Sequence, residues 1–140
     1  MVEVLVCIVL IGLAVTSLLV TLSTSIKASA INRDHVNAHA WLQTASDVLY
    51  ATPRVDCGSQ AASQEPAVEA AYSDAVKATS NPEGWGPNQI SIVGPVLFWD
   101  GKSQYQSTCY DDQGVNLQLI EIQVTAPTGH IIESVQVVKG

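Results

Sequence analysis

The sequence has few basic residues. Six lysines and arginines stand against thirteen aspartates and glutamates, which gives a net charge of −7 over 140 residues. No basic cluster occurs in the chain, so we expect no nucleic-acid binding. The acidic balance also opposes attraction to anionic lipid head groups, so any membrane association must come from burial of apolar side chains.

Cysteine is scarce, with three residues in the chain. Cys7 lies within an apolar run, where we expect it to pack as a small apolar residue. Cys57 and Cys109 lie in turn-rich polar segments, and this even pair predicts one disulfide in an oxidising compartment. The alternative is a cytoplasmic domain in which both thiols are free.

Patterns typical of catalysis are also missing. Serine, aspartate and histidine are present, but no nucleophile elbow is. His35 and His39 are four residues apart on a predicted helix and could share a metal, but no third ligand follows at a useful spacing. His130 lies in a predicted turn, and the half-formed calcium pattern at 111–116 is interpreted as a hydrated turn. We therefore expect no enzyme activity, no cofactor and no metal.

Charge is absent from Val4 to Leu22. As a helix this run spans about 29 Å, close to the hydrocarbon thickness of a bilayer, so we predict a transmembrane segment. Glu3 lies just before the run. A charge within a bilayer costs about 2.5–3.5 kcal/mol on insertion scales unless it is neutralised, so this carboxylate is the main candidate for a functional residue.

Helical periodicity continues beyond the apolar run until Pro53, which cannot extend a helix. We predict one helix of about 50 residues, with a transmembrane half over residues 1–25 and an amphipathic half over 26–52. The residues expected on the apolar stripe or beside it are Ile31, Ala38, Trp41, Leu42, Ala45, Val48 and Leu49. Trp41, Trp85 and Trp99 are expected in the core or at an interface.

The rest of the chain predicts a small domain that packs against this stripe. Residues 53–88 are expected to form a variable loop with a short helix over 65–78, capped by Ser63. Residues 89–140 predict an antiparallel sheet with a hairpin turn at Asp100-Gly101. Leu117 and Leu119 are expected on its buried face, with the segment from Ile120 to Val124 shifting to that face as well. The expected strands are 89–93, 96–99, 103–105, 116–124 and 131–138. A sheet covered on one face by the amphipathic helix predicts an α+β fold.

The chain resembles type IV pilin-like proteins, which include pseudopilins and minor pilins. The resemblance is carried by Val2-Glu3-Val4-Leu5-Val6, by the apolar helix with Gly12, and by the helix-then-sheet order. The tail is similar to minor pilins of Gram-positive actinobacteria in the segments Phe98-Trp99-Asp100-Gly101, Cys109, Leu117-Gln118-Leu119-Ile120, Pro127-Thr128-Gly129 and Val137-Val138-Lys139. The resemblance as a whole implies a pilin-like fold and a role as a structural subunit of a type IV pilus or a type II secretion-like filament.

The resemblance also implies partners and a location. Glu3 would pair with the N-terminal ammonium of a neighbouring pilin subunit, through contacts between N-terminal helices. The chain would cross the cytoplasmic membrane once, expose residues 26–140 outside, and enter a cell-surface filament. Family precursors carry a leader ending in Gly, which a prepilin peptidase removes before methylating the new N-terminus. No such Gly precedes Met1, so we expect the leader and first mature residues to be missing here.

Two other classes fit parts of the sequence. Ala28-Ser29-Ala30 matches a signal-peptidase site, which would release a secreted binding domain beginning at Ile31, although the run is long and its start is acidic. A plain single-pass anchor would leave Glu3 at the membrane interface. Lys27 and Arg33 follow the run, which by the positive-inside rule favours a cytoplasmic C-terminal part unless a basic leader precedes it.

The predicted disulfide has a measurable consequence. In the chain-entropy model, closing the loop between Cys57 and Cys109 stabilises the fold by about 4 kcal/mol. We expect reductant to lower the free energy of unfolding by that amount in a denaturant titration. Alkylation of the unfolded, unreduced chain should label Cys7 alone, whereas labelling of all three cysteines would contradict the bond.

Overall fold

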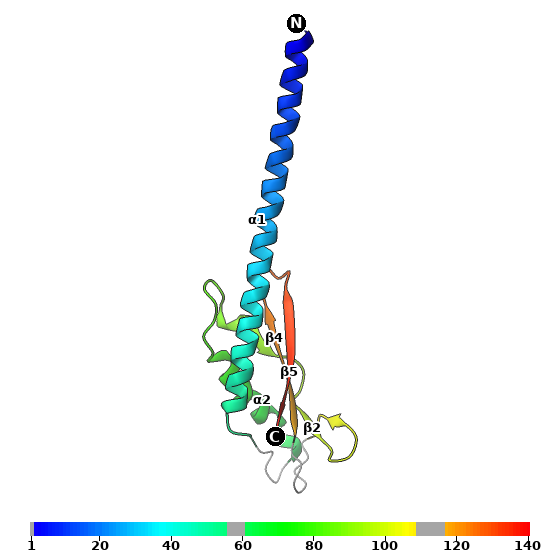
Figure 1. Cartoon of the computed structure of the whole chain (residues 1–140). Coiled ribbons are helices and arrows are strands. Elements are labelled where there is room, and N and C mark those ends of the chain that lie inside the picture. Colours follow the sequence, from blue (N-terminus) through cyan, green and yellow to red (C-terminus); the bar gives the residue numbers. More distant parts are fainter. Residues whose placement is uncertain (1, 56–60, 109–116) are drawn as a thin grey trace. The chain divides into compact units, whose positions relative to one another are not determined.

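The structure is a computed structural model that describes residues 2–55, 61–108 and 117–140, except for the side chains of residues 61–65 (Figure 1). The chain divides into two compact units, Met1–His35 and Val36–Gly140, which are described separately below. The sequence-based boundary after residue 25 followed the change in polarity, whereas this division follows the packing of the backbone.

Helix α1 runs from Val2 to Ala51 and continues through both units. Thr52 donates its backbone N–H to the Val48 carbonyl at 2.9 Å, and its hydroxyl donates to the same oxygen at 2.7 Å. Pro53 follows and has no N–H with which to continue the ladder. The prediction of one long helix ending before Pro53 is confirmed.

The second unit contains the remaining elements. They are α2 (Ala61–Lys77), the 3₁₀ turn η1 (Pro87–Gln89), β1 (Ile90–Ile92), β2 (Leu97–Trp99), β3 (Tyr105–Gln106), β4 (Gln118–Thr125) and β5 (Ile132–Lys139). The five described strands form one antiparallel sheet. Strand β4 is central: β5 pairs along one of its edges, β1 and β2 divide the other, and β3 pairs with β2. The expected α+β fold, with the long helix packed on an antiparallel sheet, is confirmed.

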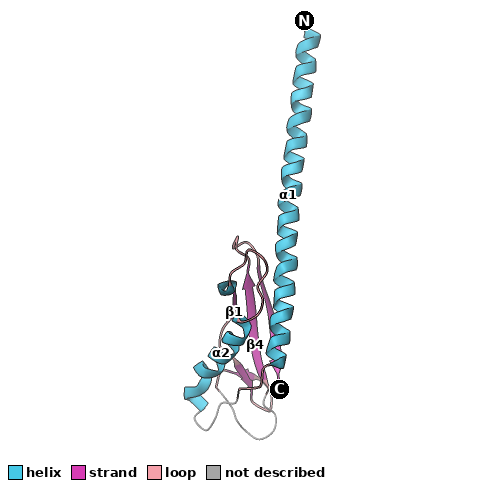
Figure 2. Cartoon of the chain, turned by 90° about the vertical axis from the view of Figure 1, so that its left-hand side faces the viewer, coloured by secondary structure: helices cyan, strands magenta, loops and turns pink. Residues whose placement is uncertain are grey.

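The core lies on one face of this sheet, where the second half of α1 and helix α2 both contribute (Figure 2). Buried side chains follow helical spacing on α1 and the alternation of a strand on β4. The largest side chains that are fully buried in this core are Trp41, Tyr72, Leu49, Ile90, Ile120, Ile122, Val68, Val76, Val124 and Val137. The expected apolar stripe is therefore buried from Ala38 to Leu49, with Val48 beside it half-buried, but the expectation for Ile31 is wrong, because its side chain is 50% exposed.

Strand β4 presents the face opposite to the one expected from its leucines. Ile120, Ile122 and Val124 are buried together with Gln118, whereas Leu117 and Leu119 are only half-buried. Because side chains alternate along a strand, burying the three β-branched residues places Gln118 in the core as well. The predicted burial is confirmed for Ile120, Ile122 and Val124 and is wrong for Leu117 and Leu119, because the longer β-branched set decides the register.

Gln118 is tolerated in the core because it joins a polar network. The Tyr72 hydroxyl donates to Gln118 Oε1 at 2.5 Å, and Gln118 Nε2 donates to the Val55 carbonyl at 2.8 Å. The Val55 N–H in turn donates to the Tyr72 hydroxyl oxygen at 3.0 Å. The network links α2, β4 and the segment that follows α1, and it satisfies polar groups that burial would otherwise penalise.

A cation from the last strand caps the C-terminal end of α1. Lys139 is buried, and its Nζ donates to the carbonyls of Leu49 at 2.7 Å and Tyr50 at 3.3 Å. The last turn of α1 has no basic residue of its own, so Lys139 supplies the positive charge that a helix C-terminus favours. Burial lowers the pKa of the Lys139 ammonium below its usual value.

Some local predictions needed correction. Helix α2 begins at Ala61, so Ser63 lies inside it and cannot be its N-cap, and the helix ends at Lys77. The hairpin at Asp100-Gly101 is present, but β3 begins at Tyr105 rather than Ser103. Asp100 Oδ1 accepts the backbone N–H groups of residues 102, 103 and 104, and these bonds hold the pKa of this carboxyl below its usual value. Gly101 takes a φ of +75° there, which glycine adopts without strain.

Removing one hydroxyl tests the buried network. Tyr72→Phe leaves Gln118 and the Val55 N–H without that partner, so we expect a loss of about 1–3 kcal/mol in the free energy of unfolding. Tyr50→Phe is the matched control, because the Tyr50 side chain is 60% exposed. Chemical denaturation of both variants measures the difference, and equal stabilities would show that the network contributes nothing.

Candidate functional site: the apolar half of helix α1

The first half of α1 exposes large apolar side chains on every side. Those between Val2 and Ile26 are 50–75% exposed. They are Val2, Val4, Leu5, Val6, Ile8, Val9, Leu10, Ile11, Leu13, Val15, Leu18, Leu19, Val20, Leu22 and Ile26. A helix that is apolar all round belongs in a large core or in a membrane, and none of its most apolar window is buried within the chain.

The hydroxyl groups in this run are satisfied inside the helix. Thr16 donates to the Gly12 carbonyl at 3.0 Å, Ser17 to Ala14 at 2.8 Å, and Thr21 to Ser17 at 2.9 Å. Such back-bonding leaves no hydroxyl proton that requires water. The run from Val4 to Leu22 is therefore compatible with hydrocarbon in its side chains as well as its backbone.

Helix α1 is long and apolar enough to cross a membrane by length and composition. A signal sequence near an N-terminus meets the same criterion.

Glu3 lies in the first turn of α1. Its carboxylate is exposed, and it forms no hydrogen bond or ion pair with another described residue. The free backbone N–H groups and the positive end of the helix dipole favour a negative charge at this position. Any neutralising cation for Glu3 would therefore have to come from outside the described chain.

The predicted disulfide and the half-formed calcium pattern fall on residues that the structure does not describe. Cys57, Cys109 and residues 111–116 all lie outside the described residues. Cys7 is an exposed free thiol on α1. Its place among apolar side chains agrees with the expected packing role only if a membrane or partner covers it.

The histidines do not gather with other ligands. His39 Nε2 lies 3.1 Å from Glu133 Oε2 on β5, and His130 is exposed in the turn before that strand. Within the described ranges, no group of three or more His, Cys, Asp or Glu side chains could hold a metal ion. His39 therefore connects α1 to the sheet within the second unit.

The tryptophans contribute to packing. Trp41 and Trp85 are buried with ring centroids 6.0 Å apart at 73°, and the Trp41 indole N–H donates to the Thr79 hydroxyl at 2.8 Å. Trp99 is half-buried and meets Tyr105 edge to face at 5.1 Å. The expected core role is confirmed for the first two.

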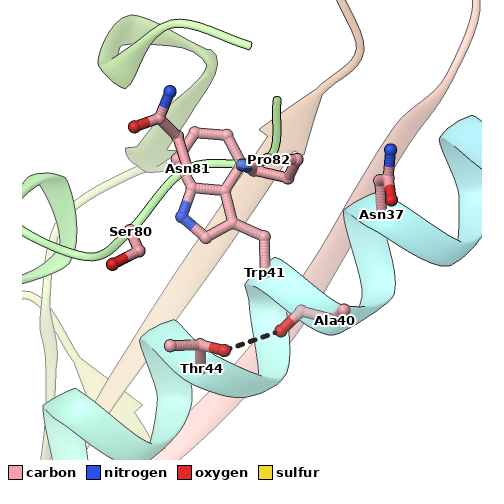
Figure 3. Close-up of a pocket in the computed structure, with 7 residues that line it drawn as sticks. All are labelled: Asn37, Ala40, Trp41, Thr44, Ser80, Asn81 and Pro82. Carbon is pink, nitrogen blue, oxygen red and sulfur yellow. Dashed lines mark hydrogen bonds between the residues drawn. The ribbon is translucent and has the colours of Figure 1, made fainter. Parts of the chain in front are cut away.

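A pocket of about 260 Å³ lies beside Trp41, between α1 and the segment after α2 (Figure 3). Its lining residues are Asn37, Ala40, Trp41, Thr44, Ser80, Asn81 and Pro82. The Thr44 hydroxyl is bonded to the Ala40 carbonyl, and the Asn81 amide donates to the Trp85 carbonyl. The polar ends of Asn37, Ser80 and Asn81 do not converge on one point, so the pocket offers no organised ligand-binding set (Figure 3).

Sequence reasoning missed three residues that organise the second unit. They are Tyr72 and Gln118 in the buried polar network, and Lys139 at the C-terminal end of α1. The alternation Gln118-Leu119-Ile120-Glu121-Ile122 contained a usable signal, since Ile120, Ile122 and Val124 share a face with Gln118. Nothing local indicated that Lys139 would reach the end of a helix 90 residues earlier in the chain.

Comparison with protein-family models, with curated proteins and with solved structures finds no match for this chain. No family is therefore assigned through relatives. The functional argument rests on the residues of α1.

Placing a charge in the middle of the apolar run tests whether this run enters a bilayer. Leu13→Asp should make insertion less favourable by about 2.5–3.5 kcal/mol, because a carboxylate at the bilayer centre is poorly solvated. Ser25→Asp, beyond the uncharged run, is the matched control and should have little effect. A microsomal insertion assay measures both variants, and equal insertion would argue against a membrane-spanning Val4–Leu22.

Proposed function

We propose that this chain is a structural subunit, of the minor pilin or pseudopilin type, in a type IV pilus or type II secretion-like filament. The observation that supports it is the arrangement of α1. Glu3 directly precedes an uncharged apolar run whose hydroxyl groups are bonded within the helix, and the same helix continues into a half that packs on an antiparallel sheet. The helix would anchor the subunit in the cytoplasmic membrane before assembly and pack against other subunits afterwards.

Glu3 has a specific task in this proposal. A carboxylate at the head of an apolar helix is costly in low dielectric when unpaired, and an opposite charge recovers much of that cost. The N-terminal ammonium of a neighbouring subunit, formed by prepilin peptidase, would supply the charge. A shift of one helical turn between the helices would leave both charges unpaired, so the pair would select a register.

The second candidate is a secreted binding domain released after Ala30, since a signal sequence satisfies the same length and polarity test. Helix α1 continues without interruption through Ala28, Ser29 and Ala30 and into Ile31. N-terminal sequencing of the mature protein separates the two candidates. A mature chain beginning at Ile31 would exclude the filament proposal, because the assembly helix would be lost.

Replacing Glu3 tests the assembly role directly. In cells that make the filament, Glu3→Leu should remain in the membrane fraction, because it adds an apolar residue to the anchor. It should be lost from sheared surface filaments, because the charge that sets register is gone. Immunoblots of both fractions measure this, and wild-type amounts of Glu3→Leu in filaments would contradict the role of Glu3.

Two further variants make the result specific. The double variant Glu3→Val, Val6→Glu keeps the composition but moves the carboxylate about one helical turn, so it should also be absent from filaments. Glu69→Leu removes an exposed carboxylate on α2 and should assemble normally. If the shifted variant assembled as well as the wild type, Glu3 would not set register.

A further inference from the structure

The segment of α1 that follows the apolar run carries only positive charge. Between Val4 and Arg33 the charged residues are Lys27 and Arg33, and every acidic residue except Glu3 comes later in the chain. Both cationic side chains are exposed, and neither forms an ion pair or a hydrogen bond with another described residue. These two cations are therefore available to an anion from outside the chain.

The acidic balance of the whole chain does not cancel this local charge. Exposed charges more than about 8 Å apart are largely screened at physiological ionic strength. The nearest carboxylate in sequence, that of Asp34, is half-buried and lies about 100° around the helix from Arg33. The expected repulsion of anionic lipid head groups was drawn from the net charge, and it does not apply to this segment.

A shallow groove lies on the same segment of α1. Its volume is about 300 Å³, and it is lined by Ile26, Ser29, Ala30 and Arg33. Steps of three and four residues place these side chains on one face of the helix. The small side chains of Ser29 and Ala30 leave room between the longer ones of Ile26 and Arg33. Because Cα–Cβ bonds tilt toward the helix N-terminus, Arg33 leans back over this room.

Ser29 brings a hydroxyl group that has no partner within the helix. The hydroxyls nearer the N-terminus donate to carbonyls of the preceding turn, and they belong to Thr16, Ser17, Thr21 and Thr24. Ser29 forms no hydrogen bond with another described residue. The groove therefore combines a guanidinium and a hydroxyl, both hydrogen-bond donors, with the apolar side chain of Ile26.

The groove lies where a membrane-spanning α1 would leave the hydrocarbon. Ile26 is 69% exposed, and Lys27 directly follows it. Arg33 lies seven residues after Ile26, about 10.5 Å along the axis. The head-group region is about 5–8 Å thick on each side of the hydrocarbon, and a long side chain that leans back can place its charge there. Both cations can thus reach the depth of the lipid phosphates.

We propose that this groove binds the phosphate of an anionic phospholipid whose head group carries no cation, such as phosphatidylglycerol. Arg33 pairs with the phosphate, Ser29 donates to one of its oxygens, and Ile26 contacts the first part of an acyl chain. A charged phosphate strengthens hydrogen bonds from both donors. Lys27, on a neighbouring face of the helix, adds to the local positive potential. The proposal rests on the proposed membrane anchoring of α1 and not on filament assembly.

Lipid competition tests this site in the full chain. The protein is purified in a mild detergent with equimolar phosphatidylglycerol and phosphatidylcholine of identical acyl chains, and mass spectrometry quantifies the lipids that stay bound. The wild type should retain phosphatidylglycerol in several-fold excess. Arg33→Gln should lower this preference about five-fold, the factor expected for one cation near an anionic surface. Lys77→Gln removes an exposed cation on α2 and should leave the preference unchanged.

A pair of serine variants tests the hydrogen bond to the phosphate. Ser29→Ala should lower the preference for phosphatidylglycerol about three-fold, because one donor is lost. Ser23→Ala is the matched control. Ser23 is also exposed and also forms no hydrogen bond with a described residue, but it lies about 120° around the helix from Ser29. Equal effects of the two variants would contradict a contact at Ser29.

Two further measurements separate this site from the anchor and from soluble phosphate. Flotation with phosphatidylcholine vesicles reports the anchor alone, so flotation with equal retention of the two lipids would overturn the lipid site and leave the anchor standing. Absence of flotation would overturn both. Glycerol 3-phosphate at millimolar concentration should not displace phosphatidylglycerol, because it lacks the acyl chain that contacts Ile26. Displacement would overturn the assignment to a lipid.

Discussion

The packing of the α1 stripe from Ala38 to Leu49 on one face of the sheet is the contact on which the second unit depends. It buries Trp41, Leu42 and Leu49 against the alternating side chains of β4 and its neighbours. Burial of side chains of this size contributes about 1.5–3 kcal/mol each before the cost of ordering the chain is counted. Helix α2 adds Val68, Tyr72 and Val76 to the same face, so both helices share one core.

The polar contacts of this unit follow from that packing. Once Ile120, Ile122 and Val124 face the core, Gln118 must enter it too, and Tyr72 and Val55 provide its hydrogen bonds. Once β5 lies beside β4, Lys139 reaches the last carbonyls of α1. These bonds add specificity rather than driving force, because a buried polar group mainly avoids a penalty by finding its partner.

Much of the architecture could be predicted from the sequence because it depends on periodicity. The apolar run, the break at Pro53 and the alternation of β5 each indicate an element without reference to distant residues. Periodicity could not settle three features. They are the exposure of the Ile31 side chain, the start of α2 before Ser63, and which face of β4 is buried. Each depends on where a neighbouring element ends or which of two apolar sets is buried, and local pattern allows either answer. The candidate site was predictable at Glu3, because a carboxylate beside an uncharged run is visible in the sequence itself.

The sequence by itself determined the two halves of α1, the α+β class and the position of the lone carboxylate at the head of the apolar run. Those features follow from the order of polar and apolar residues along the chain, which does not depend on how the chain folds. Only the tertiary structure decided that Gln118 is buried, that Lys139 caps α1 and that β5 pairs along β4. These features depend on strand register and on contacts between segments far apart in the chain, where hydrogen-bond geometry chooses among pairings that the sequence pattern leaves equivalent.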